Sequence, residues 1–134
     1  MSGGAILYID RSTITSDAID ELRAKTAELV EYVESREPRL LCYGFVIDEG
    51  AREMTVAAVH PDAASLELHL HIGGPQFAAI GRYITLRSID VFGEPSPAAA
   101  EALYEKARIL GNAEVRIHRL NPGFARPPTD RPSS

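Results

Sequence analysis

The fold of this chain depends on how one stretch is interpreted, DAASLELHLHI at residues 62–72. Polar and apolar residues alternate through its second half, a pattern typical of a half-buried strand. A strand would place Glu67, His69 and His71 on one face. Two imidazoles and a carboxylate at that spacing can bind Zn²⁺ or Fe²⁺, with His60 as a more distant ligand. The strand interpretation therefore carries a candidate metal site.

The same stretch also carries helix signals. Asp62 directly follows Pro61 and suits a helix N-cap, and the two alanines that come next favour a helix. In a helix, residues two apart point about 200° away from each other, so His69 and His71 could not share an ion. Alternation thus favours a strand, whereas the capping residues favour a helix.

Upstream, the sequence predicts a short strand followed by an amphipathic helix. Residues 5–9, AILYI, are rich in β-branched and aromatic side chains and predict the strand. Residues 15–17 offer helix N-caps, and Pro38 ends the helix. Between them, apolar residues recur at spacings of three and four, which is typical of a helix packed on one side. These residues are Ile19, Leu22, Leu29, Val30 and Val33.

Residues 40–47 and 54–59 predict a β-hairpin. Both segments are apolar at almost every position, and DEGAR at residues 48–52 separates them. Strands that are apolar on both faces need an apolar cover on each side of the sheet. The helices of this chain can supply one cover. The other must come from the rest of the chain or from a second copy, which is the first indication of a dimer.

Downstream, a strand is predicted over residues 84–92, followed by a helix and a last strand. Ser96 and Pro97 occupy the preferred cap and first positions of that helix, and Gly111 suits its C-terminal end. Residues 113–118 alternate between apolar and polar side chains, as in a strand with one wet face. We therefore expect a single domain over residues 1–120, with the C-terminal extension at 96–120. The Pro-rich segment 121–134 is expected to be disordered.

Composition excludes several classes of protein. The 134 residues carry a formal net charge of −5, so no basic surface for nucleic acid or an anionic membrane is indicated. Cys42 is the single cysteine, which excludes an intrachain disulfide. No apolar run approaches the ~18 residues that cross a bilayer, and no signal peptide is recognisable. We expect a cytoplasmic protein.

Two segments resemble the antibiotic biosynthesis monooxygenase-like family. Residues 37–45, EPRLLCYGF, follow an amphipathic helix and are similar to the family's E-P-G-C-x-x-Y passage from helix to strand. Residues 62–70, with Phe77 behind them, resemble its second helix, commonly D-x-x-A-L-x-x-H-L with an aromatic residue shortly after. The order β-α-β-β-α-β over residues 5–92 also matches the family's ferredoxin-like domain.

The resemblance implies an α+β fold. Its core is an antiparallel ferredoxin-like sheet, to which this chain adds a C-terminal helix and strand. Family members form homodimers whose sheets face each other in a dimeric α+β barrel, which would supply the second apolar cover. The resemblance also makes residues 62–72 a helix, interrupted at Gly73-Gly74-Pro75 and resumed at residues 76–80. With a helix there, we expect no metal site.

The chain departs from the family's catalytic patterns. Members that oxidise aromatic polyketides without a cofactor use pocket Asn, Tyr and Trp residues, and haem-degrading members use Asn, Trp and an iron-ligating His. This chain has no Trp, and its asparagines, Asn112 and Asn121, lie outside the matching region. Gly81 stands one turn after Phe77, where the iron-ligating His is found. We therefore expect no cofactor, and whether the protein is an enzyme stays open.

The resemblance and the residue chemistry together indicate a small-molecule site. His69 matches the second-helix His, and an imidazole can act as a general base near neutral pH. Tyr43 is the second candidate catalytic residue, because it could orient a substrate. The candidate ligand-binding residues are Tyr8, Phe45, His60 and Phe77. Core packing would explain the same side chains.

Two functions follow from these expectations. The first is a cofactor-free, oxygenase-like protein that acts on a compact phenolic or polyketide-like molecule. The alternative is a non-catalytic dimeric protein on the same fold, which binds a small ligand or serves as an accessory protein. The expected partners are a second copy of the chain and a small organic ligand.

Overall fold

The computed structural model describes residues 4–119, 123 and 124, so most of the segment predicted to be disordered, 121–134, lies outside the described residues. Five strands and three helices follow one another in this part of the chain. They are β1 (Ile6–Ile14), α1 (Ile19–Arg36), β2 (Cys42–Asp48), β3 (Glu53–His60), α2 (Ala63–Gly81), β4 (Ile84–Phe92), α3 (Pro97–Leu110) and β5 (Glu114–His118).

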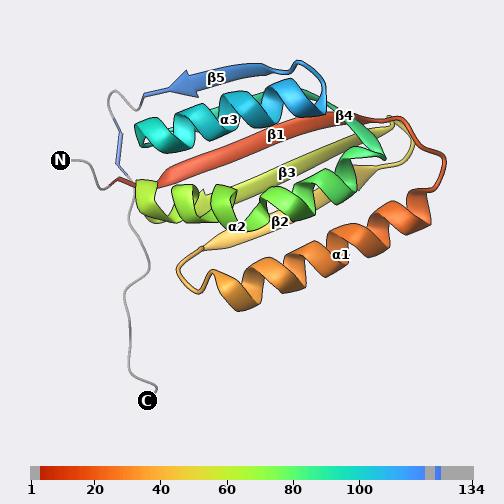
Figure 1. Ribbon diagram of the computed structural model, residues 1–134, viewed down its shortest axis with the longest axis horizontal. Helices are drawn as coiled ribbons and strands as arrows, with labels where there is room; N and C mark the ends of the chain where they lie inside the picture. The colour runs from red at the N-terminus through yellow and green to blue at the C-terminus, as the bar shows by residue number, and fades with distance from the viewer. Residues whose placement is uncertain (1–3, 120–122, 125–134) are drawn as a thin grey trace.

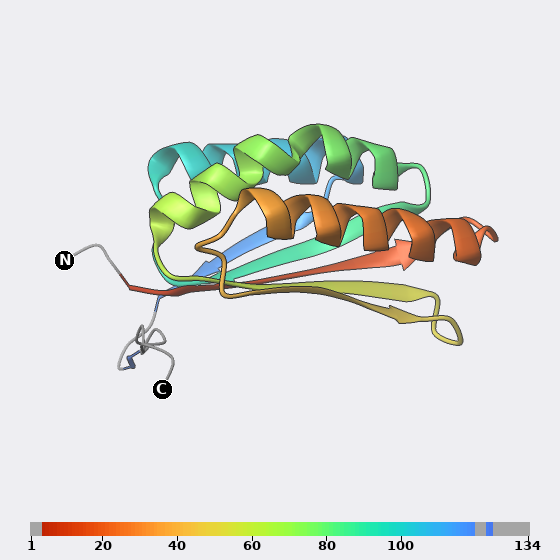
Figure 2. The same cartoon turned by 90° about the horizontal axis from the view of Figure 1, so that it is seen from below.

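The strands form one sheet in the order β2-β3-β1-β4-β5. The three helices lie side by side, with α2 between α1 and α3 (Figure 1), and all three cover the same side of the sheet (Figure 2). This confirms the predicted α+β class and the ferredoxin-like order of its first six elements. The pairings among the first four strands are all antiparallel. β5 pairs parallel with β4 of its own chain, so the complete sheet is mixed.

The decisive stretch is helical. Asp62 caps α2, since its Oδ1 accepts a hydrogen bond from the backbone N–H of Ser65 at 2.9 Å. The strand interpretation is therefore wrong. The metal site that depended on it is wrong as well, because Glu67, His69 and His71 do not lie on one face. Glu67 and His71 are exposed, whereas His69 points into the core and is 3% exposed.

The predicted interruption of α2 is also wrong, because the helix runs through residues 73–75. Pro75 is exposed, and its missing N–H removes one backbone hydrogen bond of the helix. Gly73 instead allows a close approach within the helix. A Cβ at this position would lie 2.6 Å from the ring of Phe77. The glycine therefore provides room for Phe77.

β1 extends beyond the predicted residues 5–9, because its pairing with β3 and β4 continues to residues 13 and 14. Alternate side chains of β1 face the helices, and all of them are buried. Ile6 and Ile14 are apolar, as expected for a core. The three between them, Tyr8, Asp10 and Ser12, are polar. Sheet pairing on both sides thus holds polar residues in the interior.

The opposite side of the sheet carries apolar side chains with no helix over them. Leu7 is 38% exposed and Val46 63% exposed, and Ile9, Val59 and Phe92 beside them are half-buried. This is the second apolar face that the hairpin pattern predicted. Within the described ranges, no helix is long and apolar enough to cross a membrane.

Candidate functional site

A cavity lies between the helices and the core-facing side of the sheet. Its volume is about 30 Å³, enough for about two water molecules. Most of the wall is apolar, including Leu29, Val56 and Ile80. The polar side chains that line it are Tyr8, Asp10, Ser12, Tyr43, His69 and Lys106. Few polar groups in an apolar wall are the usual composition of a small-molecule site.

A larger groove of about 260 Å³ lies between α2 and α3 and adjoins this cavity. Phe77, Lys106 and Leu110 line both spaces. Leu70 and Ile109 add to the apolar walls of the groove. A ligand in the groove would therefore meet Lys106 first, and Phe77 stands between it and His69, whose ring centroid lies 5.4 Å from that of Phe77.

His69, which lines the cavity, forms a buried pair with Glu37. Nδ1 of His69 lies 2.8 Å from Oε2 and 3.1 Å from Oε1 of Glu37, and the two side chains are 3% and 2% exposed. Glu37 is the first residue after α1, so the helix end places its carboxylate in the interior. A carboxylate can only accept, so it assigns the hydrogen of a neutral imidazole to Nδ1. Nε2 then carries the lone pair.

Aromatic rings surround His69. The ring centroid of Tyr43 lies 5.0 Å away, and Phe45 packs edge-on against Tyr43 at 5.5 Å. The hydroxyl of Tyr43 is buried and has no hydrogen-bond partner among the described residues. Burial raises the pKa of Tyr43 well above its usual value, and the nearby carboxylates of Asp10 and Glu37 raise it further. Tyr43 is therefore a hydrogen-bond donor here and not a base.

His60 lies behind His69, with 5.4 Å between the ring centroids, and does not line the cavity. Its Nδ1 contacts Oγ of Ser65 at 2.8 Å, and its Nε2 has no partner among the described residues. Burial, and then the proximity of His69, lower the pKa of His60 to about 3. The imidazole is therefore neutral at physiological pH and supports the interior side of α2.

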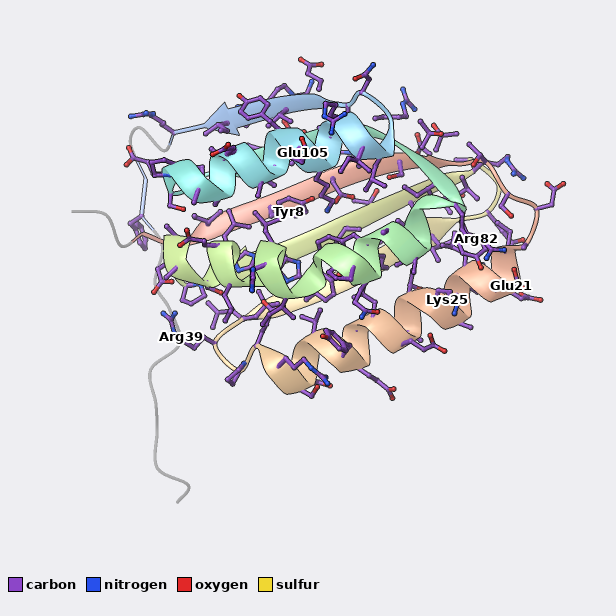
Figure 3. The ribbon with its side chains drawn as sticks, in the orientation of Figure 1. Tyr8, Glu21, Lys25, Arg39, Arg82 and Glu105 are labelled. Carbon is purple, nitrogen blue, oxygen red and sulfur yellow. The ribbon has the colours of Figure 1, made fainter. Side chains whose placement is uncertain are left out.

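A second polar group lines the same cavity. Tyr8 Oη donates to Oδ2 of Asp10 at 2.5 Å, and Nζ of Lys106 donates to Tyr8 Oη at 2.8 Å and to the same Oδ2 at 3.2 Å. Figure 3 shows Tyr8 on β1 between the ribbons of α2 and α3. Lys106 Nζ also lies 4.1 Å from the ring centroid of Phe77, a favourable cation–π distance.

Five of the six residues predicted for the site line this one cavity, namely Tyr8, Tyr43, Phe45, His69 and Phe77. The sequence prediction missed Glu37, Asp10, Ser12 and Lys106. Asp10 and Ser12 could have been found, because Ile6, Tyr8, Asp10, Ser12 and Ile14 share one parity, as they would on one face of a long strand. Lys106 lies three residues after Leu103 and four before Leu110, a spacing that places the three side chains on one face of a helix.

The class of protein is thus an α+β protein with a ferredoxin-like sheet and, under its helices, a cavity lined by both apolar and ionisable side chains. No family model and no curated protein matches the chain. Solved structures do share its fold. MupZ from Pseudomonas fluorescens has a TM-score of 0.70 at 19% identity, over 92% of this chain and 96% of MupZ.

Two further structures connect the fold to a family. SnoaB, a cofactor-independent oxygenase from Streptomyces nogalater, has a TM-score of 0.57 at 16% identity, over 70% of this chain and 98% of SnoaB. An antibiotic biosynthesis monooxygenase has a TM-score of 0.53 at 24% identity, over 64% of this chain and 92% of that protein. The chain therefore has the fold of the antibiotic biosynthesis monooxygenase-like structures, as the sequence resemblance implied.

Proposed function

We propose that this protein is a cofactor-free, oxygenase-like enzyme that removes a proton from a compact phenolic or polyketide-like molecule. The observation that carries the proposal is the buried pair of His69 and Glu37 at an apolar cavity. Nδ1 of the imidazole is bonded to the carboxylate, so Nε2 is the atom that accepts a proton. Glu37 stabilises the imidazolium that results, as a carboxylate does for a catalytic His.

The apolar wall and the neutral hydroxyl of Tyr43 support the same reaction. Tyr43 would donate a hydrogen bond to a substrate oxygen, where negative charge develops after proton removal. The walls of the cavity are mostly apolar, so a substrate anion beside them would be poorly solvated and more reactive toward O₂. Phe77 would have to move aside, because its ring separates His69 from the groove.

The chemistry balances with O₂ as the second substrate. For an acidic CH₂ group, His69 takes one proton, the carbanion adds O₂, and the returned proton completes a hydroperoxide. Loss of water then breaks the O–O bond and leaves a ketone. For a hydroquinone, two electrons and two protons pass to O₂, and the products are a quinone and H₂O₂. In both cases the first step is proton transfer to Nε2.

We also propose that two copies associate through the open side of the sheet. A second copy would cover Leu7, Ile9 and Val46, whose exposure leaves an apolar face in contact with water. Native mass spectrometry at micromolar concentration is expected to show a dimer, and Val46→Lys is expected to shift it to the monomer. A wild-type monomer under these conditions would overturn this arrangement.

Oxygen consumption with substituted hydroquinones tests the proposed activity. His69→Gln removes the base, but its side-chain amide can still donate to Glu37 and so keeps the buried carboxylate paired. We expect this variant to consume O₂ about 10²-fold more slowly than the wild type, a typical loss for a general base. The control is His71→Gln, two residues along α2 and exposed, which is expected to leave the rate unchanged.

Two outcomes would reject the enzymatic proposal. One is a wild-type rate equal to that of buffer with every hydroquinone. The other is a His69→Gln rate equal to that of the wild type. Retained binding of a hydroquinone without oxidation would favour the alternative, a non-catalytic protein that binds a small ligand.

A further inference from the structure

The core-facing side of β1 is polar where packing favours apolar residues. Tyr8, Asp10 and Ser12 are at most 2% exposed. A buried polar group destabilises the fold unless it is hydrogen bonded, yet Oγ of Ser12 has no partner within the described part of the chain. All three side chains line the cavity. A buried hydroxyl facing a cavity without an internal partner indicates that a ligand or water completes its bonding.

Lys106 and Asp10 leave one hydrogen-bond donor and one acceptor unused at the same place. Two of the three ammonium hydrogens are used by Tyr8 Oη and by Oδ2 of Asp10. Tyr8 also donates to that Oδ2, so Oδ1 is the carboxylate oxygen that these bonds leave for the cavity. Lys106 lines both the cavity and the groove. A ligand that enters from the groove therefore meets one ammonium hydrogen and one carboxylate oxygen.

The charges at this position select the kind of ligand. Asp10 already neutralises Lys106, and both side chains are largely buried, at 3% and 13% exposure. A ligand carboxylate bound to Lys106 would lie close to the carboxylate of Asp10, where the low local dielectric strengthens the repulsion. A hydroxyl group can instead accept from Lys106 and donate to Asp10. Ser12 supplies a further donor.

We propose that Asp10, Ser12 and Lys106, held in place by Tyr8, bind an uncharged hydroxyl group and select phenols and alcohols over carboxylates of the same skeleton. The apolar body of the ligand lies in the groove, against Leu70 and Phe77. This inference deepens the proposed function and rests on its cavity, but it does not depend on proton removal by His69.

The test compares two probes that differ in head group, 2-naphthol and 2-naphthoate, by equilibrium dialysis at pH 7. We expect the wild type to bind 2-naphthol at least ~10-fold more tightly, equivalent to about 1.4 kcal/mol. Asp10→Asn leaves the charge of Lys106 unpaired, so 2-naphthoate is expected to bind as tightly as 2-naphthol or more tightly. The asparagine can still accept from Tyr8 and Lys106, which preserves the local bonding.

Asp90→Asn is the matched control. Asp90 is also a buried, ion-paired aspartate, 5% exposed, but it bonds Arg116 on the opposite side of the sheet. We expect this variant to keep the wild-type preference. The proposal is overturned if the wild type binds neither probe, if it prefers 2-naphthoate, or if Asp10→Asn keeps the wild-type ratio.

The failure of this site and the failure of the proposed activity are distinguishable. His69→Gln is expected to keep the preference for 2-naphthol while it loses O₂ consumption. A wild type that selects 2-naphthol but oxidises no hydroquinone would reject the oxygenase proposal and support the hydroxyl site. A wild type that oxidises hydroquinones without any preference for 2-naphthol would reject the hydroxyl site and support the oxygenase proposal.

Discussion

Replacing His69 with leucine is expected to lower the free energy of unfolding by about 3–5 kcal/mol, because it leaves a buried charge without its partner. The carboxylate of Glu37 is 2% exposed and contacts Nδ1 of His69 at 2.8 Å. Leucine cannot donate to it, so the carboxylate loses its hydrogen bonds from Nδ1. Chemical denaturation, followed by circular dichroism, measures the loss.

Two further variants separate the charge effect from packing. His69→Gln retains a donor for Glu37 and is expected to lose less than half as much stability as His69→Leu. The double variant Glu37→Met, His69→Leu removes both polar groups and is expected to recover most of the loss, since apolar replacements of buried pairs are often neutral. If the double variant is as unstable as His69→Leu, the loss comes from packing and the assigned role of the pair is wrong.

Replacing Lys106 with methionine is expected to cost about 2–3 kcal/mol, somewhat less than a fully buried pair because the lysine side chain is partly exposed. It is 13% exposed, and Asp10 would keep the hydrogen bond from Tyr8. Methionine has a side chain of similar length, so the loss reports the missing charge, including its cation–π contact with Phe77. Thermal and urea denaturation of the variant measure it.

The companion variant is Asp10→Asn, Lys106→Met, which leaves no charged side chain in the group formed by Tyr8, Asp10 and Lys106. We expect it to be more stable than Lys106→Met alone by at least ~1 kcal/mol, because the buried carboxylate is gone. Equal stability of the single and double variants would show that Asp10 does not depend on Lys106. It would also remove the charge argument for the hydroxyl site.

Local sequence patterns were sufficient for most of the architecture. The amphipathic spacing from Ile19 to Val33 predicted α1, and the apolar pair of segments around residues 48–52 predicted the β2–β3 hairpin. The capping residue Asp62, together with the family resemblance, gave the correct structure to residues 62–72 although alternation favoured a strand. These signals act within a single helix or a single hairpin, so they can be recognised without the rest of the fold.

The predicted site residues were largely aromatic, and the charged residues beside them were found only in the structure. Tyr8, Tyr43, Phe45, His69 and Phe77 line one cavity. Their charged neighbours are separated from them in sequence. Glu37 precedes His69 by 32 residues, and Lys106 follows Asp10 by 96. No local periodicity reports pairs at such separations.

The sequence by itself determined the class of fold, the order of its elements and the apolar character of both sides of the β2–β3 hairpin. Short-range hydrophobic spacing and helix caps encode these features directly. Tertiary structure alone decided that α2 continues through Pro75, that β1 continues through Asp10 and Ser12, and that Lys106 reaches Tyr8 and Asp10. The physical reason is that pairing with two neighbouring strands, and hydrogen bonds from Lys106 of α3, compensate for polar residues that local propensity would place at the surface.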